Sequence, residues 1–203
     1  ILAALVVSNL TVTEKSYDRS RTDQALGLSW QILEVRQTPL CEDSDYDAYA
    51  IIKTDPSYLY AEAWAQSKST ACTGISVYSS AATQISTDTL TTLQLSLETF
   101  APALTSGGTP NAGYYDITLA GQSVLSKSDK KYFKGDIILK KSAGGKVDVY
   151  LKECGSCPEQ FAKTVTASGS VPLKVFVSAS VGNILPVHSA VVRIFSVKAG
   201  GAA

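Results

Sequence analysis

The amino-acid sequence predicts an all-β protein that folds as a single β-sandwich or jelly-roll. Stretches in which apolar and polar residues alternate recur along nearly the whole chain, and helical periodicity is almost absent. About ten such strands separated by short turn sequences are typical of a sandwich or a jelly-roll. With 203 residues, of which 45% are hydrophobic, the chain is long enough to bury one large core.

The first predicted strand, residues 1–14, is apolar on both faces at its beginning and stays apolar on one face. Residues on that face are Leu2, Ala4, Val6, Ser8, Leu10 and Val12. A terminal strand this hydrophobic needs a sheet to join, either within its own chain or in a neighbouring molecule. The polar residues 15–24 have no apolar periodicity, so we expect a linker there, followed by a β-sandwich domain over residues 25–203.

The remaining strands follow in order after the linker. Residues 26–32 alternate, and Leu33 and Val35 then change face, which predicts a bulge. The alternation of residues 58–65 predicts a strand, although their Ala and Glu content would also suit a helix. Further strands are predicted at 46–53, 74–78, 92–100, 114–119, 136–141, 146–151, 171–179 and 190–197. The turn Ser-Ala-Gly-Gly between 136–141 and 146–151 predicts a hairpin.

Composition narrows the class of partner and the compartment. Charged residues are only 18% of the chain, with 18 basic against 18 acidic, which argues against nucleic acid or an anionic membrane as a partner. The chain holds 25 serines and 18 threonines and no methionine, which favours an exported protein whose leader has been removed. No run of 18 apolar residues is present to span a membrane. Asn9 begins an N-x-[ST] triplet, a candidate glycosylation site, and the expected location is extracellular or at the cell surface.

The four cysteines allow three disulfide pairings, which the sequence does not decide between. They are Cys41, Cys72, Cys154 and Cys157, and the simplest pairing joins the first two and the last two. A zinc site is the rival interpretation, but only one C-x-x-C pair is present where structural zinc usually has two. Free or partly paired thiols are the third alternative.

An acidic run near the first predicted strands is a candidate calcium site. Asp43, Asp45 and Asp47 alternate along residues 42–47 and offer the hard oxygen ligands that calcium prefers. The run lacks the glycine and the later glutamate of an EF-hand. A solvated acidic face beside a turn is the plainer explanation, and no other cofactor is expected.

Catalysis is poorly supported, whereas carbohydrate binding has some support. His188 is the only histidine, and the sequence has no G-x-S-x-G, Walker or Rossmann pattern, so we expect no catalytic residues and no enzyme. Several aromatic residues on alternating strands are candidates for stacking on sugars, although such residues more often lie in a core: Trp30, Tyr58, Tyr60, Trp64, Tyr114 and Tyr115.

The terminal strand and linker, the Ser/Thr-rich β body, the cysteines and the missing leader together resemble those of archaeal extracellular filament subunits. These include the threads, bundling pili and cannulae, and more loosely the camelysin-like biofilm fibre subunits. The resemblance implies that the N-terminal strand completes the sheet of the next subunit, as in chaperone–usher pili. The partner would then be a second copy of the chain, joined head-to-tail in an open, pilus-like filament. Calcium at subunit contacts of some relatives fits Asp43, Asp45 and Asp47 loosely.

Two alternatives to a filament keep the first strand within its own chain. One is a secreted monomeric β-sandwich that acts as an adhesin or carbohydrate-binding protein, with glycans as partners. The other is a capsid-type jelly-roll. The linker of ten residues spans roughly 33 Å when extended, which permits pairing in either sense.

Overall fold

Thirteen β-strands make up most of the described part of the chain. The computed structural model describes residues 20–37, 45–68, 75–101, 113–181 and 188–200. The strands, in chain order, are β1 (Arg21–Ala25), β2 (Leu28–Gln37), β3 (Tyr46–Asp55), β4 (Tyr58–Ser67), β5 (Ile75–Ser86), β6 (Thr92–Phe100), β7 (Tyr114–Leu119), β8 (Gln122–Ser126), β9 (Tyr132–Ser142), β10 (Lys146–Lys152), β11 (Gln160–Thr166), β12 (Ser170–Val181) and β13 (His188–Gly200). Within the described ranges, no helix is long and apolar enough to cross a membrane.

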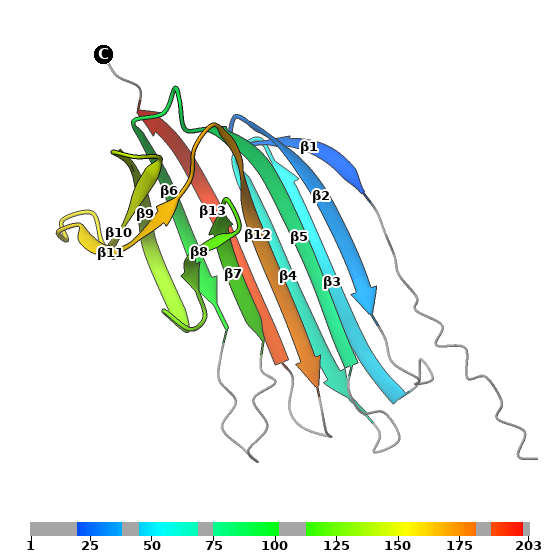
Figure 1. The fold of residues 1–203 in the computed structure, drawn as a ribbon. Coiled ribbons are helices and arrows are strands. Elements are labelled where there is room, and N and C mark those ends of the chain that lie inside the picture. The colour runs from blue at the N-terminus through cyan, green and yellow to red at the C-terminus, as the bar shows by residue number, and fades with distance from the viewer. Residues whose placement is uncertain (1–19, 38–44, 69–74, 102–112, 182–187, 201–203) are drawn as a thin grey trace, which may run out of the picture.

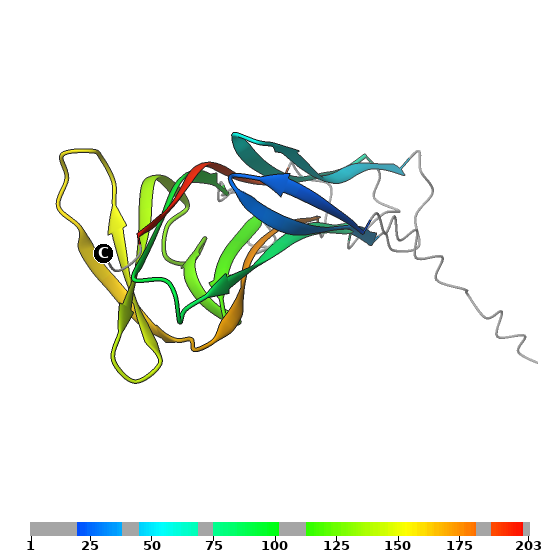
Figure 2. The same ribbon diagram turned by 90° about the horizontal axis from the view of Figure 1, so that it is seen from above.

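The strands form two antiparallel sheets that pack face to face as a β-sandwich (Figures 1 and 2). The six-stranded sheet has the order β1-β2-β5-β12-β7-β8, and the seven-stranded sheet has the order β11-β10-β9-β6-β13-β4-β3. The chain passes repeatedly from one sheet to the other, so strands distant in sequence become neighbours. The hairpins of β9, β10 and β11 lie at the opposite end of the molecule from β1 and β3 (Figure 1). The all-β sandwich expected from the sequence is confirmed.

The core lies between the sheets because each central strand turns an apolar face inward. In β4, Leu59, Ala61, Ala63 and Ala65 are fully buried, while the residues between them are only partly buried. The strands β6 and β12 repeat this alternation, with buried leucines in β6 and buried valines and Leu173 in β12. Burial on one face alone fixes the register, since a slip of one residue would place the apolar set in water.

Two tight hairpins have residues in the left-handed region at both turn positions. Leu26 (φ 59°) and Gly27 (φ 74°) join β1 to β2, and Ala120 (φ 51°) and Gly121 (φ 75°) join β7 to β8. Positive φ at both positions matches the type I′ turn, whose twist suits an antiparallel hairpin. Leu26 and Ala120 occupy positions that usually favour Asn, Asp or Gly, so neither hairpin has a strong signal in the sequence.

A polar cluster connects the six-stranded sheet to the edge of the seven-stranded sheet. Arg21 on β1 and Glu34 on β2 lie on the same face of their sheet as buried Trp30 and Ile32. Glu34 Oε1 accepts a hydrogen bond from the backbone N–H of Ile52 at 3.0 Å, and Arg21 Nη2 donates to the Ile52 carbonyl at 2.7 Å. Arg21 Nη1 also donates to Glu34 Oε1 at 3.1 Å. Because β3 is an edge strand, these contacts satisfy backbone groups that would otherwise be open to pairing with another chain.

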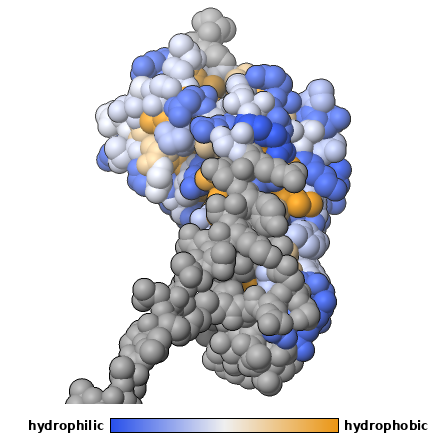
Figure 3. All heavy atoms as spheres, turned by 90° about the vertical axis from the view of Figure 1, so that its right-hand side faces the viewer, coloured by the Kyte–Doolittle hydropathy of each residue, from blue (hydrophilic) through white to orange (hydrophobic). Residues whose placement is uncertain are grey.

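A second pair of contacts extends the same cluster along the edge. The Thr54 hydroxyl donates to Asp23 Oδ2 at 2.6 Å, and Arg21 Nε donates to the same oxygen at 2.8 Å. These two hydrogen bonds hold the pKa of Asp23 below its usual range. This edge faces the viewer in Figure 3, where the described surface is mostly hydrophilic with small hydrophobic patches.

Several strands differ from the sequence-based expectation. Residues 21–24, expected to end the linker, belong to β1. No bulge interrupts β2, and Leu33 instead points outward with 37% of its surface exposed. The strands β8 and β11 have no counterpart in the prediction. Residues 58–65 form a strand rather than a helix, and the predicted bounds of β6 and β7 coincide with the observed ones.

The cluster at β3 predicts a specific loss of stability. Replacing Glu34 with Ala leaves the Ile52 N–H and one Arg21 N–H without their partner, so the free energy of unfolding should fall by about 1–3 kcal/mol. The control is Gln31→Ala, an exposed outward-facing position on the same strand, which should change stability by less than about 0.5 kcal/mol. Urea unfolding measures both variants. Equal losses in the two variants would show that the cluster does not stabilise the edge.

Candidate functional site

The outward face of the seven-stranded sheet carries an open hollow of about 330 Å³. Its lining residues come from three adjacent strands and comprise Lys53 on β3, Tyr58, Tyr60 and Glu62 on β4, and Arg193 on β13. Registers place Tyr60 directly between Lys53 and Arg193. The volume is at the lower end of the range typical of small-molecule sites. We call this depression the β4 hollow.

Glu62 organises the aromatic side chains around the β4 hollow. Its Oε1 accepts a hydrogen bond from the Tyr49 hydroxyl at 3.0 Å, and its Oε2 accepts one from the Tyr60 hydroxyl at 2.7 Å. Tyr49 also stacks on Trp64, with ring centroids 5.6 Å apart and planes inclined by 12°. The two hydrogen bonds and the stack hold Trp64, Tyr49 and Tyr60 in one fixed arrangement on the surface.

Burial and the Glu62 carboxylate raise the pKa of both tyrosines. For Tyr60 and Tyr49 the larger cause is partial burial, and the hydrogen bond to Glu62 adds to it. Their hydroxyl groups therefore stay protonated, and remain donors, to higher pH than in a free tyrosine. Both carboxylate oxygens of Glu62 act as hydrogen-bond acceptors.

Arg193 forms the other wall of the β4 hollow. Its guanidinium carbon lies 5.2 Å from the centroid of the Phe195 ring and 5.9 Å from that of the Tyr58 ring. Both distances are within the range of cation–π attraction. Within the described residues, the side chains of Arg193 and Lys53 form no hydrogen bond and no ion pair.

A second hollow, of about 300 Å³, lies toward the other end of the same sheet. It is lined by Lys130, Tyr132, Phe133, Lys134 and Glu153. The Tyr132 ring packs edge-to-face on Phe100 at a centroid distance of 6.5 Å, and Lys130 pairs with Glu153 at 2.8 Å. We call this depression the β9 hollow.

Two continuous rows of outward side chains connect the two hollows. One row, across β3, β4, β13, β6 and β9, is Lys53, Tyr60, Arg193, Glu98 and Lys134. The adjacent row is Ile51, Glu62, Val191, Phe100 and Tyr132. Since neighbouring strands are about 4.8 Å apart, each row extends over roughly 19 Å. The face therefore offers an elongated platform of aromatic rings and polar groups.

The structure separates the six aromatic residues that the sequence suggested for sugar stacking. Tyr58 and Tyr60 line the β4 hollow, and Trp64 lies beside it on the same face. Trp30 is a core residue whose indole N–H donates to the Ala25 carbonyl at 3.0 Å. Tyr115 is also buried, and its hydroxyl donates to the Lys130 carbonyl.

Tyr114 lies on the outward face of the other sheet, where it packs against Phe176 at 6.4 Å. Four members of the site were not predicted from the sequence: Tyr49, Glu62, Arg193 and Lys53. Period two along β4 places Glu62 on the same face as Tyr60 and Trp64, so that residue was within reach of the sequence. The other three join the site only through the register of neighbouring strands.

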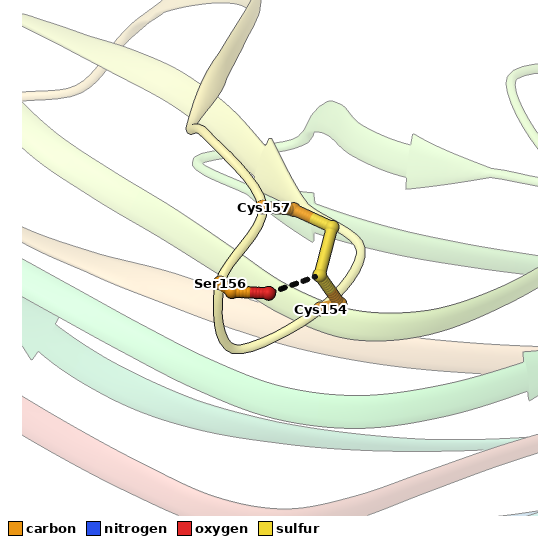
Figure 4. Close-up of a disulfide and its surroundings, with 3 residues drawn as sticks. All are labelled: Cys154, Ser156 and Cys157. Carbon is orange, nitrogen blue, oxygen red and sulfur yellow. Dashed lines mark hydrogen bonds between the residues drawn. A yellow bond between two sulfur atoms is a disulfide. The ribbon is translucent and has the colours of Figure 1, made fainter.

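The cysteine prediction is confirmed for one pair. Cys154 and Cys157 form a disulfide in the turn between β10 and β11, with the Ser156 hydroxyl 3.5 Å from the Cys154 sulfur (Figure 4). The bond removes both thiolates from the zinc alternative. Cys41 and Cys72 lie outside the described residues, so their pairing stays a prediction.

The structure describes two of the three predicted calcium ligands, Asp45 and Asp47. Asp47 forms an ion pair with Lys68 at 2.6 Å, which competes with metal binding. Asp43 lies outside the described residues. In the described ranges, no three His, Cys, Asp or Glu side chains are close enough together to hold a metal ion. Calcium at Asp43, Asp45 and Asp47 therefore stays a prediction.

Other predicted features also fall outside the described ranges. They are Asn9 and the strand face formed by Leu2, Ala4, Val6, Ser8, Leu10 and Val12. The backbone of His188 begins β13 opposite Ala65.

Comparisons with known proteins give only distant likenesses. No protein-family model and no curated protein sequence matches the chain. A legume lectin-like domain from Entamoeba histolytica aligns with a TM-score of 0.39 at 12% identity, over 79% of this chain and 91% of that one. The Ca²⁺-bound exoplasmic/lumenal domain of VIP36 aligns with a TM-score of 0.33 at 9% identity, over 80% and 93% of the two chains. At these scores, the assignment of a functional site rests on the geometry of this chain alone.

The hydrogen bonds to Glu62 predict how the stability of the protein and the titration of its tyrosines change at alkaline pH. Burial and the hydrogen bonds to Glu62 favour the protonated hydroxyl groups in the folded state, so the pKa values of Tyr49 and Tyr60 are raised above the ordinary 10.0. The stability that the protonated hydroxyl groups contribute is fully present below the pKa of the unfolded state. It is lost as pH rises through the folded pKa. Glu62→Gln removes the carboxylate charge and should lower both pKa values, as followed by tyrosinate absorbance.

The control for this titration is Glu159→Gln, a change of the same kind on a carboxylate that pairs with Lys140 instead of a tyrosine. It should leave the tyrosine titration unchanged. A Glu62→Gln curve that superimposes on the wild-type curve contradicts the proposed coupling.

Proposed function

We propose that this protein is a carbohydrate-binding β-sandwich module that binds saccharides on the outward face of its seven-stranded sheet. The observation that carries the proposal is the β4 hollow, where Tyr58 and Tyr60 converge with Glu62, Lys53 and Arg193. A sugar ring has an apolar face and a rim of hydroxyl groups. An aromatic ring packs against that apolar face, while charged side chains bind the hydroxyl groups.

The exposure of the aromatic rings supports a role in ligand binding rather than in packing of the core. Tyr49 remains 40% exposed although it stacks on Trp64, and Tyr132 is 54% exposed beside the β9 hollow. Exposed aromatic rings held in fixed positions are typical of binding surfaces, because little conformational entropy is lost when a ligand docks. An extracellular location is part of the proposal and is supported by the Cys154–Cys157 disulfide, which persists in oxidising compartments.

The proposal predicts which aromatic residue binds the ligand. In a screen of soluble polysaccharides by affinity electrophoresis, the 203-residue chain should be retarded by at least one of them. Tyr60→Ala should weaken that binding by about tenfold, equivalent to ~1.4 kcal/mol, because it removes the ring at the centre of the β4 hollow. Isothermal titration measures the change.

The matched control is Tyr114→Ala, which removes a tyrosine from the outward face of the six-stranded sheet and should leave the affinity unchanged. Absence of binding to every saccharide would overturn the proposed function. An equal loss from both variants would move the site away from the β4 hollow.

A filament subunit is the second candidate, and an open strand edge favours it. Residues 28–32 of β2 pair with β1, whereas residues 33–37 pair only with β5 among the described residues. On the side away from β5, no described strand pairs with that half of β2, so its backbone groups could accept a strand from a neighbouring subunit. An incoming strand that pairs with this edge would extend the six-stranded sheet.

Deletion of residues 1–13 tests this second candidate. If residues 2–12 join a neighbouring molecule, the 203-residue chain should form filaments under the electron microscope and the truncated chain should not. Val6→Asp should impair assembly, because it would bury an unpaired carboxylate at a cost of several kcal/mol. Thr11→Asp, on the face that turns polar, is the milder control. Filaments formed by the truncated chain would exclude the donor-strand model.

A further inference from the structure

We infer that the saccharide is acidic, and that its carboxylates bind the row of cations formed by Lys53, Arg193 and Lys134. The inference rests on the proposed carbohydrate-binding function and specifies its ligand class. The predicted ligand is a polyuronate chain lying across the strands, from the β4 hollow toward the β9 hollow.

The β4 hollow has a surplus of hydrogen-bond donors. Both oxygens of Glu62, its only carboxylate, already accept hydrogen bonds from the Tyr49 and Tyr60 hydroxyl groups. Lys53 and Arg193 have no acceptor among the described residues. A hollow with free charged donors and an occupied acceptor is complementary to a ligand that brings its own anionic oxygens.

Arg193 is held in a geometry suited to a carboxylate. Its guanidinium lies 5.2 Å from the Phe195 ring and 5.9 Å from the Tyr58 ring, so the rings restrict its motion. A guanidinium presents two parallel N–H groups that bind both oxygens of one carboxylate. Because the rings already order this side chain, less conformational entropy is lost on binding than for a free arginine.

The spacing of the cations favours a chain of sugars over a single unit. Lys53, Arg193 and Lys134 lie in one row on β3, β13 and β9, which are separated in each case by one intervening strand. The backbones that carry successive cations are therefore about 10 Å apart. The residues between them are Tyr60 and Glu98, which offer a ring and an acceptor to sugar hydroxyl groups. A regular array of cations matches a polymer whose carboxylates recur regularly.

The test compares polygalacturonate with its methyl ester, which keeps the sugar chain and removes the charge. Binding of the 203-residue chain is measured by isothermal titration in the presence of a calcium chelator. The acid form should bind at least about tenfold more tightly than the ester, as expected when a charge-assisted pair is lost. Binding of the acid form should also weaken as ionic strength rises.

Variants locate the charge effect on the sheet. Arg193→Gln and Lys134→Gln should each weaken binding of the acid form. Arg193→Lys should recover only part of the loss, because lysine lacks the two parallel N–H groups of the guanidinium. Lys174→Gln is the matched control, since Lys174 also lies over an aromatic ring but on the other sheet. It should leave the affinity unchanged. Thermal unfolding confirms that each variant is folded.

The outcomes separate this inference from the proposed function. Equal binding of acid and ester, or binding of neutral polysaccharides alone, overturns the acidic ligand and leaves carbohydrate binding intact. If the Arg193→Gln and Lys134→Gln variants prefer the acid form as strongly as the unchanged protein does, the row of cations is not where the carboxylates bind. Absence of binding to every saccharide, neutral or acidic, overturns both.

Discussion

Each sheet of this protein buries one face of its strands and leaves the other face to water, and the rest of the structure depends on that constraint. The buried leucines of β6 and the buried alanines and Leu59 of β4 oppose a slip of one residue against β13, and the observed register keeps them inward. That register in turn sets the outward neighbours, so Arg193 lies between Tyr60 and Glu98. The rows on the outer face are thus a consequence of packing on the inner face.

The strand edges at β3 and β2 differ in whether their backbone groups have partners. At β3, Arg21 and Glu34 occupy the backbone groups of Ile52, which discourages a further strand from pairing there. At β2, residues 33–37 keep a free edge among the described residues. The two candidate functions therefore use different parts of the molecule: a sheet face for saccharide binding and a strand edge for assembly. We therefore expect a substitution on the face to leave assembly intact, and a substitution at the edge to leave saccharide binding intact.

The sequence carried enough information for most of the fold because alternation is a local property. The strands β6, β7 and β12 bury mostly apolar residues at every second position, and their positions were predicted accordingly. The strands β1, β8 and β11 escaped prediction for identifiable reasons. The turns Leu26-Gly27 and Ala120-Gly121 lack the Asn or Asp that usually marks a tight hairpin. In β11 the one large aromatic, Phe161, points outward and is 59% exposed.

The candidate site could be predicted only in part, because it combines a local pattern with a non-local register. Period two along β4 brings Tyr58, Tyr60 and Trp64 to one face, and this much follows from the sequence. The same reasoning could not exclude Trp30 and Tyr115, since alternation does not say which face is buried. Arg193 belongs to the last strand, and only the observed sheet order places it beside β4.

Mapping of backbone amide chemical shifts during titration with a bound saccharide tests the central claim most directly. The account predicts that the largest changes fall in β3, β4, β13 and β6, around Tyr60 and Arg193, while β5 and β12 of the opposite sheet are nearly unaffected. Changes concentrated on the six-stranded sheet, with β4 and β13 unperturbed, would contradict the assignment of the seven-stranded face as the binding surface.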